Sequence, residues 1–154
     1  MNAEVKQQWL DALRSGEYEQ TRGRLRRGMP LDPEDLDDGY NAGYCCLGVL
    51  CDLAVKAGVT QLHEERPFEE SDYENERNYV SYSYGVSEGR KDSSVLPPEV
   101  VKWAGLGNAV DAVNPYVEEL PADADEFTPR ATLASENDGG KSFEEIAKII
   151  EDVL

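Results

Sequence analysis

The sequence has few of the residues on which catalysis and metal binding usually depend. Its 154 residues include one histidine, His63, and three cysteines, Cys45, Cys46 and Cys51. An odd cysteine count with two adjacent members argues against a disulfide framework and favours a reducing cytoplasm. The cysteines also lack the two-residue spacing of zinc knuckles, so we expect no metal and no cofactor.

Long apolar runs and basic residues are scarce as well. No apolar stretch approaches the roughly 20 residues that cross a bilayer, and no segment resembles a secretory signal. The 15 basic residues against 32 acidic ones give a net charge of -17. This charge argues against direct binding to nucleic acid or to an anionic membrane surface. It leaves three explanations open, namely solubility, a salt-rich host, or imitation of the DNA backbone by carboxylates.

One stretch, Tyr44 to Gly58, has almost no charge, and we expect the rest of the chain to pack around it. Its apolar residues follow helical spacing, with Cys46, Leu50 and Ala57 on one stripe. Gly58 stands where a left-handed helix cap is favoured. The pattern predicts a buried central helix.

The two ends of the chain predict amphipathic helices. Asn2 can cap a first helix that turns Trp9 inward and ends at Gly16. Near the other end, Ser142 and Glu145 have the spacing of a capping box at the start of a last helix.

The segments between these helices predict a mixture of short elements. Alternating patterns favour strands, and proline starts or glycine ends favour helical turns. We predict strands over residues 18–26, 59–62, 78–85 and 114–120, and helices over 96–106 and 131–137. The order is irregular, which is typical of a single α+β domain with a small, mainly antiparallel sheet. Acidic surface loops are expected at about 28–43 and 64–77.

Several stretches resemble a group of small proteins encoded by bacteriophages and prophages. They are Trp9–Gly16, Tyr18–Gln20, Arg24–Arg26, Tyr44–Leu53, Trp103–Leu106 and Asn137–Ala147. The most specific are YCCLGVLCDL in the middle and NDGGKSFEEIA near the end. The resemblance implies a phage accessory protein, and such proteins often act on host enzymes or defence systems. No activity is assigned to that group, so the resemblance transfers no catalytic residue.

An arginine-rich face is the first candidate site. The predicted strand would carry Tyr18, Gln20, Arg22, Arg24 and Arg26 on one side, next to Tyr44 and the start of the central helix. Guanidinium groups two residues apart can grip one phosphate or carboxylate, and a helix N-terminus would add oriented amides. The alternative is that these arginines pair with the acidic loops of the chain itself.

A cysteine nucleophile is the second candidate site. Cys45 stands at the expected N-terminus of the central helix, where the helix dipole would lower a thiol pKa, and His63 is the available base. The alternative is a buried structural cysteine, because the surrounding peptidase signatures are missing.

No complete catalytic constellation can be assembled from these residues, so the favoured function is not enzymatic. We expect a cytoplasmic protein of an infected or lysogenic bacterium that sequesters a host protein, such as a defence factor, or a phosphorylated small molecule. The alternatives are a cysteine-dependent hydrolase or transferase that uses Cys45, and a DNA mimic that inhibits a DNA-binding enzyme.

Overall fold

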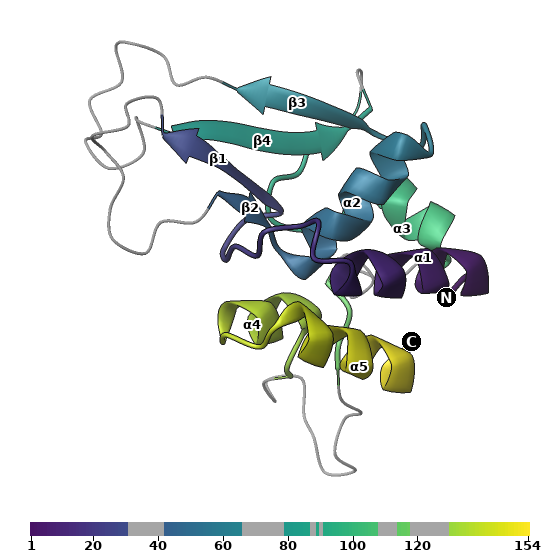
Figure 1. Ribbon diagram of the computed structural model, residues 1–154. Coiled ribbons are helices and arrows are strands. Elements are labelled where there is room, and N and C mark those ends of the chain that lie inside the picture. Colours follow the sequence, from purple (N-terminus) through teal and green to yellow (C-terminus); the bar gives the residue numbers. More distant parts are fainter. Residues whose placement is uncertain (31–41, 66–78, 87–88, 90, 108–113, 118–129) are drawn as a thin grey trace.

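Helices pack beside and below a small antiparallel sheet (Figure 1). A computed structural model describes residues 1–30, 42–65, 79–86, 89, 91–107, 114–117 and 130–154. Its elements are α1 (Ala3–Arg14), β1 (Arg26–Pro30), β2 (Gly43–Tyr44), α2 (Cys46–Lys56), β3 (Gln61–Glu65), β4 (Tyr79–Gly85), α3 (Pro98–Ala104), α4 (Leu133–Asp138) and α5 (Phe143–Val153). The predicted α+β class with a small antiparallel sheet is confirmed.

Helix α2 lies in the core, as its lack of charge predicted. Its buried residues are Cys46, Leu47, Gly48, Val49, Leu50, Cys51 and Ala54. Helices α1, α3 and α4 contact it, and so do β2 and β3. The indole Nε1 of the buried Trp9 donates a 2.9 Å hydrogen bond to the carbonyl oxygen of Cys46, which fixes α1 against the first turn of α2.

The sheet has the strand order β2-β1-β4-β3, and every pair is antiparallel. Arg26 pairs with Tyr44 between β1 and β2, and Glu64 pairs with Tyr82 between β3 and β4. Because residues two apart in a strand share a face, Tyr82 and Tyr84 project from the same side of β4. The alternation over 78–85 therefore predicted β4 correctly.

The strand predicted at 59–62 begins later, at Gln61. The backbone amide of Val59 still bonds the carbonyl of Ala54 in α2, and Gly58 adopts a left-handed φ of 72°. The end of the helix therefore uses the residues that the alternation assigned to the strand. At 114–120, the described residues show only a single bridge between Tyr116 and Thr132, and residues 118–120 lie outside the described ranges.

The strand predicted over residues 18–26 is wrong. Only Arg26 belongs to a strand, and Gln20 makes a single bridge to Tyr44. The amide of Thr21 bonds the carbonyl of Tyr44, and the amide of Tyr44 bonds the carbonyl of Glu19. These bonds run across β2 without extending into a ladder, because Gly23 at a φ of 77° turns the chain away.

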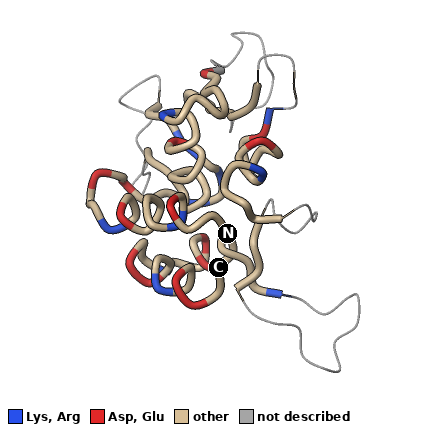
Figure 2. The backbone as a smooth tube through the Cα atoms, turned by 90° about the vertical axis from the view of Figure 1, so that its right-hand side faces the viewer, with Lys and Arg blue, Asp and Glu red and all other residues tan. Residues whose placement is uncertain are grey.

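The terminal helices follow their predicted caps. The Asn2 side chain accepts from the amides of Glu4 and Val5, and Ser142 and Glu145 form the reciprocal capping box of α5. α1 and α5 lie side by side, so the two ends of the chain meet (Figures 1 and 2).

The predicted acidic loops fall mostly outside the described residues. Residues 31–41 and 66–78 are not described, whereas 28–30 belong to β1 and 64–65 to β3. Most of the negative charge belongs to these undescribed segments, because more than half of the 32 acidic residues lie outside the described ranges. The described residues are consequently close to charge balance, and Figure 2 shows acidic and basic positions mixed along their helices.

Candidate ligand-binding surface

Cys45 is buried and protonated in this fold. Its side chain is 3% exposed, and its Sγ accepts a hydrogen bond from the Gly48 amide at 3.4 Å as the N-cap of α2. Burial raises the pKa of the Cys45 thiol to about 11, outweighing the helix amides that lower it. The expected low-pKa thiolate is therefore wrong, because desolvation wins at this helix end.

His63 does not meet Cys45. Its Nε2 lies 2.9 Å from the carbonyl oxygen of Gly85, and it sits on β3 at one edge of the sheet. Cys45 directly follows β2 at the opposite edge, with β1 and β4 between. Three strand spacings correspond to roughly 14 Å, far beyond the reach of a nucleophile and its base.

The other two thiols are buried in the same way as Cys45. Cys46 and Cys51 are fully buried, and burial raises the pKa of both thiols. Among the described residues, no group of three or more His, Cys, Asp or Glu side chains is placed to hold a metal ion. Likewise, no helix in the described part of the chain is long and apolar enough to span a membrane.

The start of α2 is occupied by the C-terminal motif. The side-chain oxygen of Asn137, which is completely buried, accepts from the Cys46 amide at 3.2 Å. The Asn137 side-chain nitrogen donates to the carbonyl of Thr21 at 2.8 Å. Since Asn137 and the Cys45 sulfur take the first-turn amides of Cys46 and Gly48, the predicted anion site at this helix end is wrong.

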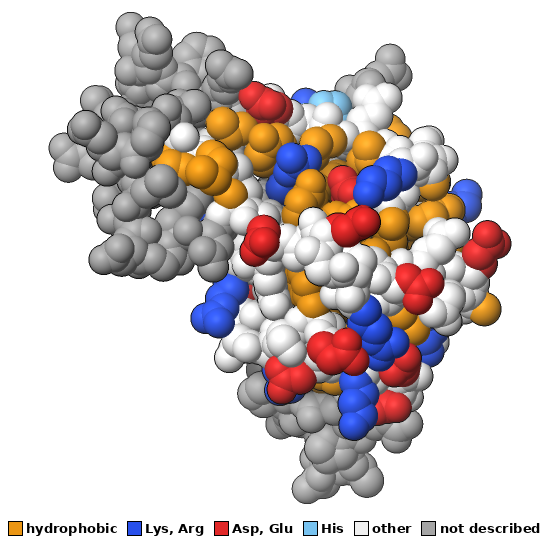
Figure 3. All heavy atoms as spheres, in the orientation of Figure 1, with side chains coloured by type: hydrophobic (Ala, Val, Ile, Leu, Met, Phe, Trp, Pro, Cys, Tyr) orange, Lys and Arg blue, Asp and Glu red, His pale blue; other side chains and the backbone are white. Residues whose placement is uncertain are grey.

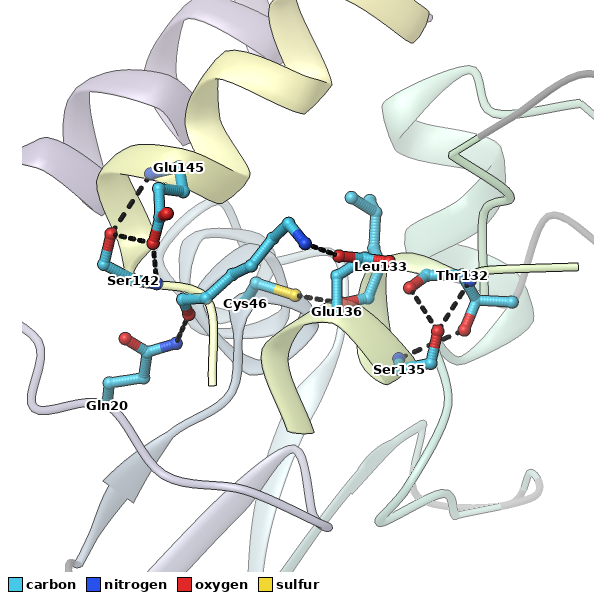
Figure 4. Close-up of polar contacts among 9 residues, drawn as sticks. Gln20, Cys46, Thr132, Leu133, Ser135, Glu136, Ser142 and Glu145 are labelled. Carbon is cyan, nitrogen blue, oxygen red and sulfur yellow. Dashed lines mark hydrogen bonds and ion pairs between the residues drawn. The ribbon is translucent and has the colours of Figure 1, made fainter. Parts of the chain in front are cut away.

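Gln20 belongs to the same structural network. Its Nε2 donates to the Asn137 side-chain oxygen at 2.9 Å and to the Lys141 carbonyl at 2.8 Å. Figure 4 shows Gln20 reaching toward the α4–α5 turn, beside the Cys46 thiol that donates to the Leu133 carbonyl. Gln20 therefore holds the fold together and is not directed at a ligand.

The predicted arginine face is divided. Arg22 is exposed, and one of its guanidinium nitrogens lies 3.0 Å from where a Cβ on Gly140 would stand. Arg26 lies instead against Tyr44 and Tyr82. Arg24 is half-buried in the turn before β1, outside any strand. The structure thus does not bring the predicted arginines together on one face.

Arg26 stands in an aromatic setting that the sequence did not reveal. Its guanidinium carbon lies 4.2 Å from the centroid of the Tyr82 ring and 5.0 Å from that of Tyr44. The Tyr44 ring in turn meets the Tyr18 ring edge to face, with centroids 5.1 Å apart and an interplanar angle of 87°. All four side chains are half-buried. We call Tyr18, Arg26, Tyr44 and Tyr82 the tyrosine–arginine surface.

An ion pair closes one side of this surface. The Tyr18 hydroxyl donates to Asp52 at 2.7 Å and accepts from the Lys56 ammonium at 2.8 Å. Lys56 also pairs with Asp52 at 3.0 Å, one helical turn apart on α2. Figure 3 shows hydrophobic side chains gathered over the sheet and α2, with basic and acidic groups among them. The charges of Asp52 and Lys56 are therefore already satisfied within the chain.

The phenols of Tyr18 and Tyr44 are protonated. Burial, the largest effect, raises the pKa of Tyr18 and of Tyr44, although Lys56 and Arg26 respectively oppose the rise. A protonated phenol can donate a hydrogen bond. The surface consequently presents donors and ring faces, and not phenolate charge.

Sequence reasoning placed Tyr18, Arg26 and Tyr44 correctly near one another but missed Tyr82, Asp52, Lys56 and Asn137. The alternation of β4 contained a signal for Tyr82, since it put Val80, Tyr82 and Tyr84 on one face. No sequence signal indicated that β4 would pair with β1 and so bring Tyr82 to Arg26.

The described residues form a small α+β domain that carries the tyrosine–arginine surface. The chain belongs to the family described as "Domain of unknown function (DUF8296)", whose model matches residues 1–154. No curated protein matches the chain, and no solved structure does.

Proposed function

We propose that this chain is a non-enzymatic binding protein that sequesters a partner through the tyrosine–arginine surface. The observation that carries the proposal is the arrangement of Arg26 against the rings of Tyr44 and Tyr82 on an accessible face. Tyrosine and arginine dominate the energetic centres of protein interfaces, because they combine large contact area with hydrogen bonding.

The partner that fits best is a protein of the bacterial host. The resemblance to phage-encoded proteins supports a host factor, such as a protein of a defence system. A phosphorylated small molecule is the alternative partner, because a single arginine can also bind one phosphate. Three free thiols agree with action in the reducing cytoplasm.

The cysteine-dependent enzyme has little support. The Cys45 thiol is buried with its pKa raised to about 11, and His63 lies at the opposite edge of the sheet. Catalysis through Cys45 would require both the thiolate and a neighbouring base.

Capture from a bacterial lysate tests the proposal. Wild-type chain and the Arg26→Gln variant are immobilised in parallel, with Arg14→Gln as the matched control, because Arg14 joins α1 to α5. We expect one host protein to be retained by wild type and Arg14→Gln and lost from Arg26→Gln. A panel of nucleotides and sugar phosphates in calorimetry covers the small-molecule alternative. Equal retention by all three proteins, or none by wild type together with no heat in calorimetry, would refute the proposal.

A DNA mimic is the second candidate function, and the net charge of -17 favours it. In that case, the partner is a DNA-binding enzyme and the contacts are carboxylates, so binding weakens steeply as salt rises. Capture that survives molar salt and depends on Arg26 would contradict the mimic and support the tyrosine–arginine surface.

A further inference from the structure

The side chains around Arg26 offer hydrogen-bond donors that the described part of the chain does not use. The guanidinium of Arg26 contacts two rings, but no described residue accepts a hydrogen bond from it. The hydroxyls of Tyr44 and Tyr82 likewise bond to no described residue. Three donor groups thus share one half-buried region without an acceptor from the described residues.

A third hydroxyl belongs to Tyr84. Tyr84 projects from the same face of β4 as Tyr82, its side chain is completely buried, and its Oη has no hydrogen-bond partner among the described residues. Arg26, Tyr44 and Asp52 are near enough to influence the pKa of Tyr84, which burial raises well above its usual range.

Asp52 is a carboxylate close to these groups. Its Oδ2 accepts from the Tyr18 hydroxyl at 2.7 Å and also pairs with Lys56 at 3.0 Å. The Arg26 guanidinium is positively charged and can only donate hydrogen bonds, and the tyrosine hydroxyls can donate as well, so together they can donate to an oxyanion. The chemistry of the site is therefore complementary to a negatively charged oxygen group.

The backbone fixes this arrangement. Arg26 pairs with Tyr44 across β1 and β2, so both side chains start from neighbouring strands. A Cβ on Gly28 would stand 2.8 Å from a ring carbon of Tyr82 and 2.5 Å from the carbonyl oxygen of Val80. Glycine at this position therefore lets the Tyr82 ring lie over β1, where it meets Arg26. The donors are held in place before any ligand arrives.

We infer that Arg26, Tyr44 and Tyr82 form a binding site for an oxyanion, a carboxylate or phosphate group carried by the sequestered partner. The inference rests on the proposed function and names the chemical group that the surface recognises. The guanidinium supplies the charge-assisted hydrogen bonds, and the two hydroxyls complete the shell around the oxygens.

Binding of small oxyanions to the full chain tests this site. Phenyl phosphate, methyl phosphate, benzoate and acetate are titrated separately, and the Nε–Hε signal of Arg26 and the ring signals of Tyr44 and Tyr82 are followed by NMR. We expect saturable shifts at these groups for the preferred anions, and benzylammonium as the cationic probe should produce none. A preference for the phosphates indicates a phosphorylated partner, and a preference for the carboxylates indicates a peptide carboxylate. Either preference supports the site.

Variants separate the site from general charge effects. Arg26→Gln should weaken the preferred anion by about tenfold or more, as expected for loss of a charge-assisted bond. Tyr44→Phe and Tyr82→Phe remove only a hydroxyl and should each weaken it severalfold, whereas Arg14→Gln should bind normally. Shifts that fail to saturate, or equal affinity in Arg26→Gln, would overturn the inference.

Failure of the inference is distinguishable from failure of the proposed function. Host-protein capture that is lost in Arg26→Gln, together with oxyanion shifts that do not saturate, keeps the binding surface and removes the oxyanion site. Oxyanion binding without capture of any partner keeps the site and removes sequestration of a host protein.

Discussion

The side-chain oxygen of Asn137 lies 3.2 Å from the backbone nitrogen of Cys46, so the end of α4 caps the start of α2. This contact joins the two most specific motifs of the sequence, which are 91 residues apart. It also explains why the N-terminus of the buried helix is not available for a ligand. The candidate binding site is consequently the tyrosine–arginine surface and not the N-terminus of α2.

Asn137→Ala should destabilise the fold by about 2 to 4 kcal/mol, because a buried amide loses its acceptor and the Thr21 carbonyl loses a donor. Chemical denaturation monitored by circular dichroism measures the change. Asn2→Ala removes an exposed cap from α1 and should cost only about 1 kcal/mol. Equal losses in the free energy of unfolding for the two substitutions would mean that the buried Asn137 contact stabilises the fold no more than an exposed helix cap does.

Gly48→Ala should also destabilise the protein, although alanine is normally the better residue inside a helix by about 0.5 to 1 kcal/mol. A Cβ at Gly48 would stand within van der Waals overlap of the Leu25 carbonyl oxygen, at the point where the chain before β1 crosses α2. We expect a loss of about 1 to 3 kcal/mol, typical of overpacking. An increase in the free energy of unfolding would show that Leu25 and α2 are not in close contact.

The cysteines should make stability fall at alkaline pH. The folded pKa of Cys45 is about 11, above the ordinary thiol value of 9.0, so between these values the unfolded chain releases a proton that the folded chain keeps. Stability from this thiol is therefore complete below about pH 9 and is lost as pH rises toward 11. Urea unfolding at pH 7.5, 9 and 10.5 measures the trend. A stability that rises over this interval would contradict a buried, neutral thiol.

Cys45→Ser should keep both the fold and partner capture. Serine is a favoured helix N-cap, so its hydroxyl can replace the sulfur that accepts from Gly48. In the wild type, a thiol reagent at neutral pH should label none of the three cysteines until denaturant is added, because all are buried. Rapid labelling of Cys45 in the native chain, with loss of function in Cys45→Ser, would restore the enzymatic alternative.

Local patterns predicted much of the fold. The caps at Asn2 and Ser142 and the uncharged stretch of α2 depend on neighbouring residues, so sequence alone located these helices. The alternation of β4 was equally local. These elements give the class of fold and most of the core.

The candidate site depended on contacts that no local pattern contains. The alternation from Tyr18 to Arg26 suggested a strand, but Tyr18 is held by Asp52, and Gln20 is held by Asn137. These partners are 34 and 117 residues away in sequence. The pairing of β1 with β4 likewise brought Tyr82 to Arg26, and long-range pairing of strands is not encoded in their periodicity.

Hydrogen exchange of the complex with the captured host protein tests the central claim most directly. The account predicts new protection of backbone amides in β1 and β4 and at Tyr44, where the tyrosine–arginine surface lies. The helices α1 and α5, whose contact lies elsewhere, should exchange at unchanged rates. Protection confined to α1 and α5, with β1 and β4 unaffected, would contradict the assignment of this surface as the binding site.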